Sequence, residues 1–141
     1  MIQKVVPVIL RKIDHQPHLL VFRHPLAGIQ IVKGTVEPNE TLEQACLREL
    51  YEESGIVKST VRSYLGLYHP KQLGHAWHMF YCETSQNLAS HWTHYCLDDG
   101  GLNFDFFWHP LSSTPSDEWH PIFQDALKFI VDSLNSLETK N

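Results

Sequence analysis

One helical segment, residues 41–54, constrains the fold of this chain more than any other part of its sequence. Thr41 followed by Gln44 is typical of a capping box at a helix start, and Gly55 is typical of a helix end. Apolar residues recur every four positions along the segment, at Leu42, Cys46 and Leu50. Because such a stripe lies on one face of a helix, the segment must pack that face against another layer of structure.

The same helix carries three acids on one face, because Glu49, Glu52 and Glu53 have the i, i+3, i+4 spacing. Like charges this close repel, and the last turns of a helix disfavour anions, so a cation is expected beside them. Clustered hard oxygen ligands suit magnesium or manganese. Arg48 can hold one carboxylate in a two-point pair, and the bare backbone of Gly34 allows its carbonyl to approach a metal closely. A solvated acidic face is the alternative interpretation.

The rest of the chain alternates between strand and helix patterns. β-Branched and apolar runs predict strands over residues 5–10, 18–23, 29–33, 61–68, 76–82 and 102–108, with a turn over residues 14–17. An amphipathic helix is predicted over residues 121–137, and residues 86–101 are predicted to form a long loop or an irregular hairpin. In a chain of 141 residues without repeats, this order predicts a single α/β (α+β) domain, residues 1–141, with helices packed on a mixed or antiparallel sheet.

The charge balance limits the classes of partner. Lys and Arg number 11 against 16 Asp and Glu, which gives a formal net charge of -5. A protein that binds nucleic acid by neutralising phosphates is normally basic, so nucleic acid is disfavoured. An anionic small ligand would need local positive charge or metal ions. The sequence has neither a long uninterrupted apolar run nor an apolar leader at its start, so no membrane association is expected.

Cysteines and histidines could in principle form metal sites. The three cysteines, Cys46, Cys82 and Cys96, cannot all pair with one another and match no zinc spacing, so they predict buried reduced thiols in a cytoplasmic protein. The ten histidines include two pairs with i, i+3 spacing, His75 with His78 and His91 with His94. A metal pair is conceivable for either, and scattered strand or surface histidines are the simpler interpretation.

Residues 34–56 resemble the Nudix box of MutT-like hydrolases, Gly-x5-Glu-x7-Arg-Glu-U-x-Glu-Glu-x-Gly-U, in which U is a bulky aliphatic residue. Every specified position matches, with Leu50 and Ile56 in the two U places. Seven fixed residues, each at about 5% usage, would match by chance on the order of 10⁻⁹ per window. The resemblance implies the Nudix fold, an α/β/α sandwich around a mixed β-sheet.

The resemblance also implies an enzyme, a pyrophosphohydrolase. Nudix hydrolases cleave a nucleoside diphosphate linked to a further group X, and release a nucleoside monophosphate and phosphorylated X. The reaction needs magnesium or manganese to neutralise the diphosphate and to activate water. A nucleotide-binding regulatory module that uses the same fold without turnover is the alternative, and the complete set of box carboxylates argues against it.

Within the box, the resemblance implies individual roles. Metal binding falls on four residues: Glu49, Glu52, Glu53 and Gly34. The same glutamates and Arg48 are the expected catalytic residues, with Arg48 as the orienting partner. One glutamate would serve as, or position, the general base, and the sequence does not identify which. Glu40 would organise the loop before the helix.

Outside the box, the candidates rest on position alone. Lys33 directly precedes the box and Arg23 ends a predicted strand, so both could contact substrate phosphate, and both could equally be ordinary exposed residues. Trp92 could stack on a nucleobase, an interaction worth ~1–3 kcal/mol, or pack in the core. A later carboxylate completes the metal site in some relatives, and the candidates here are Asp98, Asp99 and Glu118. Turn and capping roles are the alternative for these acids.

The sequence specifies the substrate poorly. Pro70 lies close to the place where a proline marks many ADP-ribose hydrolases, but proline is common beside strand ends. Residues 72–74 occupy the region in which a tyrosine marks diadenosine polyphosphate hydrolases, and they contain none. The expected partner is a nucleotide-derived small molecule. The oligomeric state is open, a homodimer included.

Overall fold

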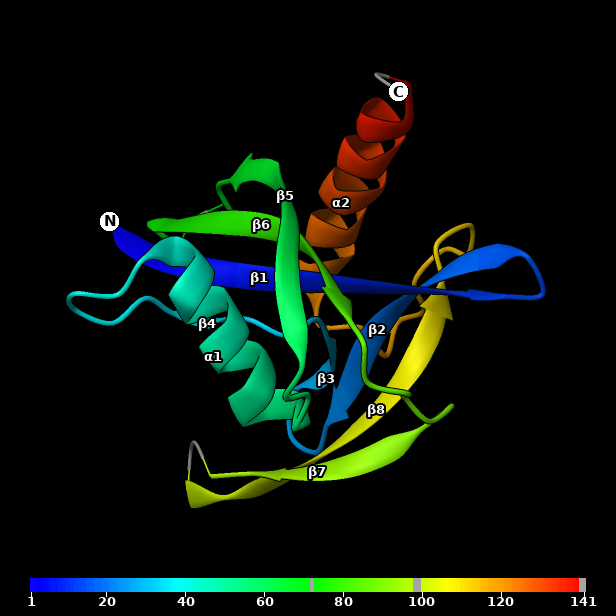
Figure 1. Ribbon diagram of the computed structural model, residues 1–141, viewed down its shortest axis with the longest axis horizontal. Coiled ribbons are helices and arrows are strands. Elements are labelled where there is room, and N and C mark those ends of the chain that lie inside the picture. The colour runs from blue at the N-terminus through cyan, green and yellow to red at the C-terminus, as the bar shows by residue number, and fades with distance from the viewer. Residues whose placement is uncertain (72, 98–99, 140–141) are drawn as a thin grey trace.

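The computed structural model describes residues 1–71, 73–97 and 100–139, in which strands and helices follow the expected order (Figure 1). The first half contains β1 (Ile2–Ile13), β2 (Gln16–His24), β3 (Gly28–Gln30), β4 (Gly34–Thr35) and α1 (Leu42–Ser54). The second half contains β5 (Ser59–Tyr68), β6 (His75–Thr84), β7 (Trp92–Cys96), β8 (Leu102–Pro110) and α2 (Pro121–Thr139).

β1 is the strand that joins the two halves of the sheet. Its first part pairs in parallel with β6, and its last four residues pair in antiparallel fashion with β2. On its other side, Lys4 and Val5 pair with Thr35 and Gly34 of β4. The strand order is β5-β6-β1-β2-β8-β7, with β3 on β2 and β4 on β1. The sheet is therefore mixed, as the sequence predicts.

The two helices cover opposite faces of this sheet. Successive side chains of a strand point to opposite faces, and in β1 Val5 and Ile9 pack in the core beneath α1. Val6 and Val8 pack in a second core with Ile130 of α2. Figure 1 shows α1 and α2 on opposite sides of β1. The predicted α/β/α arrangement around a mixed sheet is confirmed.

Both ends of α1 are capped as predicted. Thr41 Oγ1 accepts a hydrogen bond from the backbone N–H of Gln44 (3.1 Å), and Gln44 Oε1 accepts one from the N–H of Thr41 (3.0 Å). Gly55 takes a left-handed φ of 82°, and its N–H donates to the carbonyl of Tyr51 (2.9 Å). These caps set both ends of the helix. The three clustered acids therefore lie in its second half.

α2 is amphipathic, as its sequence pattern predicts. Its buried residues are Phe123, Ala126, Leu127 and Ile130. Their spacing places them on one face, toward the sheet. Within the described ranges, no helix is both long enough and apolar enough to cross a membrane.

The strand predicted over residues 29–33 is confirmed only at its start: β3 ends at Gln30, residues 31–33 lie in no strand, and the separate short strand β4 follows at Gly34. β3 pairs with β2, and β4 pairs with β1. β1 and β2 are hydrogen-bonded only through the last four residues of β1, so they diverge near this segment. The chain changes neighbours between them, and Ile31 and Val32 point into the two different cores.

Of the two predictions for residues 86–101, a long loop or an irregular hairpin, the structure has the hairpin, because the segment contains β7, which pairs in antiparallel fashion with β8. The ring of Trp92 stacks on that of Phe106, with centroids 5.2 Å apart and planes 9° from parallel. Along β7, half-buried and exposed side chains alternate. Because the outward-facing residues of β7 are polar, a search for apolar runs does not detect this strand.

The cysteines are buried and free, as predicted. Cys46 of α1 and Cys82 of β6 face each other, with 3.8 Å between their Sγ atoms. The hydrogen bond with Cys82, together with burial, raises the pKa of the Cys46 thiol. A protonated, buried thiol reacts slowly, so this pair belongs to the core.

Candidate active site

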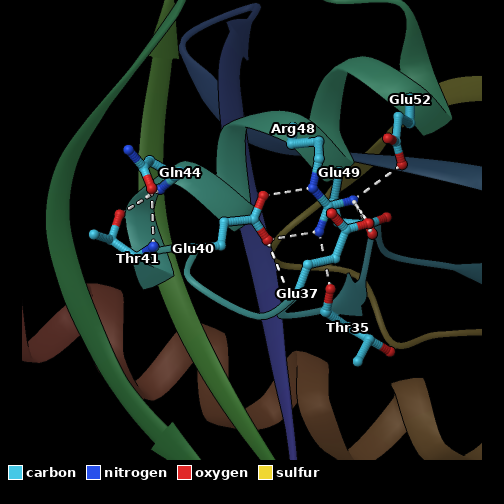
Figure 2. Close-up of polar contacts among 8 residues, drawn as sticks. All are labelled: Thr35, Glu37, Glu40, Thr41, Gln44, Arg48, Glu49 and Glu52. Atoms are coloured by element: carbon cyan, nitrogen blue, oxygen red, sulfur yellow. Dashed lines mark hydrogen bonds and ion pairs between the residues drawn. The ribbon is translucent and has the colours of Figure 1, made fainter.

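Arg48 lies at the centre of the acidic cluster on α1 (Figure 2). Its Nε and Nη2 donate to the two carboxylate oxygens of Glu40 (2.6 and 2.9 Å). Its Nη1 donates to Glu49 Oε1 (2.8 Å) and to Glu52 Oε2 (3.1 Å), and its Nη2 also donates to the carbonyl of Thr35 (2.9 Å). One guanidinium thereby connects β4, the loop before α1 and the acidic face.

These contacts keep the carboxylate of Glu40 ionised. Hydrogen bonds from Arg48, helped by the backbone N–H of Glu37 (3.0 Å), lower the pKa of Glu40 to about 2. Hydrogen bonding to Glu40 in turn raises the pKa of Arg48, although burial opposes this. The side chain of Glu49 is only 8% exposed. A carboxylate buried to that extent is costly unless a positive group pairs with it, and Arg48 supplies that group.

Position 34 needs a glycine because its backbone packs directly against the side chain of Glu49. A Cβ atom on Gly34 would lie 1.8 Å from Cδ of Glu49, far closer than two carbon atoms can approach. Any larger residue would push the carboxylate out of its place. β4 thus brings a bare stretch of backbone directly against the acidic face of α1.

Lys33, which directly precedes Gly34, contacts two aromatic rings of the core under α2. Nζ of Lys33 lies over the rings of Trp77 (4.8 Å to the centroid) and Phe123 (5.4 Å). Burial lowers the pKa of Lys33, as does the charge of Lys4, whereas the negative charge of Glu53 raises it.

Most of the chain, and not only its helix α1, has a counterpart among known families. Residues 1–127 match the family model of the NUDIX domain. The chain belongs to the NUDIX domain family. The resemblance seen in residues 34–56 is thereby confirmed at the level of the family.

The relatives of this Nudix protein have names that refer to different activities and ligands. It is 37% identical over 62 residues to the NAD-capped RNA hydrolase NudC of Vibrio vulnificus (strain CMCP6), a match that covers 42% of this chain and 24% of that protein. A UDP-X diphosphatase structure has a TM-score of 0.69 at 14% identity, covering 96% of this chain and 63% of that one. The NUDIX domain of Shewanella oneidensis NrtR, complexed with ADP ribose, has a TM-score of 0.64 at 16% identity, covering 94% and 87%. The chain spans about a quarter of the length of the curated relatives it matches, and the structural likenesses show a shared fold alone.

The donor atoms on the Nudix helix suit a hard divalent ion. Glu49, Glu52, Glu53 and the carbonyl of Gly34 offer oxygen only, which magnesium and manganese prefer. In the described part of the chain, no three His, Cys, Asp or Glu side chains converge as a ready-made metal site. Glu49 and Glu52 are turned toward Arg48 instead. The close packing of Gly34 on Glu49 nevertheless holds two of the donor residues together, so the set fits such an ion.

Two candidates outside the box bind each other. Arg23 donates to the carboxylate of Glu118 through Nε and through Nη2, the latter at 3.1 Å from Oε1. The guanidinium carbon of Arg23 also lies 5.0 Å from the centre of the Phe107 ring. A phosphate contact by Arg23 and a metal contact by Glu118 stay predictions, and either would require this exposed pair to separate. Asp98 and Asp99 lie outside the described residues.

β7 contacts the C-terminal end of the Nudix helix. Trp92 Nε1 donates to the carbonyl of Ser54 (2.9 Å), and one face of its ring is covered by Phe106, so a nucleobase could use only the other face. Nucleobase stacking by Trp92 stays a prediction. His94 Nε2 donates to the carbonyl of Glu52 (3.0 Å), a contact that sequence reasoning missed. Since 42 residues separate the two, only knowledge of the β7 pairing could have revealed it.

Two hollows lie away from the acidic face. One, of about 470 Å³, is lined by Arg11, Tyr81 and Trp108 among others. The other, of about 730 Å³, lies between the β1–β2 hairpin and the second half of α2. Both adjoin the C-terminal end of β1, whereas Gly34 pairs with its N-terminal half. Charge, not concave shape, therefore identifies the candidate site.

Proposed function

We propose that this Nudix protein hydrolyses the diphosphate of a nucleoside diphosphate linked to a group X, and releases a nucleoside monophosphate and phosphorylated X. The observation that carries this proposal is the Arg48 network, which holds Glu40, Glu49 and Glu52 beside Gly34. A face that only kept the protein in solution would need neither a buried glutamate nor a glycine packed against it.

Glu49, Glu52, Glu53 and the Gly34 carbonyl would hold magnesium or manganese. When bound, such an ion neutralises the diphosphate and lowers the pKa of a water molecule. In the hydrolysis, a water oxygen would bond to one phosphorus atom while the bond from this phosphorus to the bridging oxygen breaks, and the bridging oxygen would leave with the other phosphate. A glutamate of this face accepts the proton, directly or through a second water.

Arg48 is a positioning residue in this scheme. Its planar guanidinium holds Glu40 at two points and still reaches Glu49, which an ammonium could not do from the same place. Lys33 adds a fixed positive charge beside Glu53, where it can contact a substrate phosphate.

The net charge of the chain limits how the substrate arrives. At -5, long-range electrostatics repel a polyphosphate, so most of the positive potential at the site must come from bound metal. The same charge disfavours nucleic acid as the substrate and favours a nucleotide-derived small molecule. Free buried thiols favour a reducing compartment, the cytoplasm.

A nucleotide panel tests the proposal. The names of the relatives supply its members: ADP-ribose, a UDP-linked compound and NAD. Chromatography of the products, with magnesium and with EDTA, should show a nucleoside monophosphate released from at least one member, and only when magnesium is present. Tight binding of a panel member without any release would instead support the nucleotide-binding regulator.

A further inference from the structure

Two side chains of β7 bind the C-terminal end of α1 from outside the helix. The last carbonyls of a helix have no partner within it, so they need donors from elsewhere. Nε2 of His94 donates to the carbonyl of Glu52 (3.0 Å), and Nε1 of Trp92 donates to that of Ser54 (2.9 Å). Because successive side chains of a strand point in opposite directions, His94 and Trp92 share one face of β7. That face is turned toward the helix end.

Both donors are held in place by their surroundings. The ring of Trp92 stacks on Phe106 of β8, which anchors it to the sheet. A carbonyl oxygen can only accept, so Nε2 of His94 carries the proton. The imidazole also packs against the cap of the helix, since a Cβ atom on Gly55 would lie 2.9 Å from its Nδ1. β7 therefore holds the last turn of α1 through two hydrogen bonds and one close contact.

The last turn of α1 is the part of the helix that most needs such support. It carries Glu52 and Glu53, and both are repelled by Glu49 one turn earlier. It also lies at the negative end of the helix dipole, where anions are disfavoured and the helix frays. Arg48 holds Glu40 by two hydrogen bonds but reaches Glu52 by one, at 3.1 Å. Donors on the terminal carbonyls offset part of this negative charge and keep the turn closed.

We infer that His94, assisted by Trp92, is a positioning residue for the divalent ion, because it fixes the turn from which Glu52 and Glu53 project. The inference rests on the proposed function for the role of the ion. His94 lies 42 residues after Glu52, outside residues 34–56, so the Nudix box does not contain this contact. Hydrogen bonds that hold a metal ligand from behind are typically worth 10- to 100-fold in metal affinity, which makes the effect measurable.

Manganese binding without nucleotide tests the inference without turnover. Electron paramagnetic resonance measures free Mn²⁺ for the unmodified protein and for two variants. His94→Phe removes the donor and keeps a ring, and should weaken manganese binding at least ~10-fold. His94→Gln can donate through its amide N–H in place of Nε2, and should stay within ~3-fold. The control is Thr93→Val on the same strand, where the lost hydrogen bond goes to Asp105 (2.7 Å) and not to α1; it should change binding less than ~2-fold.

Amide hydrogen exchange of the metal-free protein is the second readout. In His94→Phe the amides of residues 52–54 should exchange at least ~5-fold faster, and those of residues 45–48 should keep their rates, because the helix opens locally from its C-terminal end. Trp92→Phe, which keeps the stacking on Phe106 and removes the N–H, should change both readouts in the same direction. It serves as the second variant if His94→Phe does not fold.

Unchanged manganese affinity or unchanged exchange in the last turn of the folded variants would overturn the inference. Equal losses in His94→Phe and in either His94→Gln or Thr93→Val would also overturn it, as would no measurable manganese binding by the unmodified protein. Hydrolysis of a panel member together with His94-independent manganese binding removes the inference and leaves the proposed function standing. His94-dependent manganese binding without hydrolysis of any panel member overturns the proposed function and keeps the role of His94.

Discussion

The helices α1 and α2 cover opposite faces of one sheet, but they bury different chemistry. In residues 121–137, where burial is described, the buried side chains of α2 are all apolar, among them Phe123 and Ile130. α1 buries Cys46 and Leu50 in the same way, and it also buries Glu49, which is 6% exposed. A buried carboxylate lowers stability unless it is paired, so α1 depends on Arg48 where α2 depends on packing alone.

This difference separates stability from function within one fold. Substitutions in the apolar face of α2 should lower the free energy of unfolding and leave the site of a folded molecule intact. Substitutions in the acidic face of α1 should remove activity and leave the fold intact. If stability and function do not depend on different helices, substitutions in α1 and α2 will show it.

The largest effect on stability is expected from Ile130→Ala. Ile130 is fully buried in α2, and removing a buried aliphatic side chain costs about 2–5 kcal/mol of unfolding free energy. Urea unfolding measures the loss. The rate per folded molecule, measured below the unfolding transition, should stay unchanged. A fully folded but inactive Ile130→Ala protein would show that α2 takes part in the site.

Glu53→Gln should give the largest effect on activity. The change keeps the shape of the side chain and removes one charge, so turnover should fall at least ~10²-fold, the scale of a lost metal ligand or base. Circular dichroism should show an unchanged fold. Glu43→Gln, the same change on the exposed first turn of α1, is the control and should stay within ~2-fold. Full activity in folded Glu53→Gln would remove Glu53 from the site.

Arg48→Lys tests how the acids are held. An ammonium cannot reproduce the paired hydrogen bonds to Glu40, so the magnesium concentration at half-maximal activity should rise ~10-fold. The pKa of Glu40, about 2 in the unmodified protein, should move up toward 4.5 in carboxyl NMR. A folded pKa lowered in this way stabilises the protein above pH 4.5, and the contribution disappears as the pH falls toward 2. An unchanged magnesium midpoint with a large loss of nucleotide affinity would mean that Arg48 binds substrate.

The smallest effect is expected from Thr41→Ala at the start of α1. Loss of the hydrogen bond from Gln44 N to Thr41 Oγ1 should cost about 1 kcal/mol in thermal unfolding. Turnover should be nearly unchanged, because the cap lies two turns before the glutamates. A loss of activity out of proportion to the loss of stability would show that the cap positions the acidic face.

Sequence patterns predicted those parts of the molecule whose signals are local. The capping box at Thr41 and Gln44, the stop at Gly55 and the acidic spacing of α1 all lie within one helix, and the structure has each of them. The apolar runs likewise predicted most strands. For β7 the sequence predicted only a loop or an irregular hairpin without strand bounds, because this strand is stabilised by pairing with β8 and by the stacking of Trp92 on Phe106, not by an apolar run of its own.

The parts of the site that sequence could not predict depend on long-range pairing. Lys4 meets Thr35 only because β1 pairs with β4 across 31 residues. Arg23 and Glu118 were predicted for separate roles, yet they form one ion pair across 95 residues. No spacing rule links residues so far apart. The sequence therefore underestimated how many charged side chains contact one another near the box.

The central claim is that the acidic face of α1 acts through a divalent metal to bind and cleave a diphosphate. Calorimetry with a non-hydrolysable analogue of the best panel substrate tests it most directly, with magnesium and with EDTA, for the unmodified protein and for Glu53→Gln. Magnesium should tighten binding at least ~10-fold in the unmodified protein, and Glu53→Gln should abolish most of that gain. Equal affinity with magnesium and with EDTA would contradict the claim, because positive charges of the protein, and not bound metal, would then carry recognition.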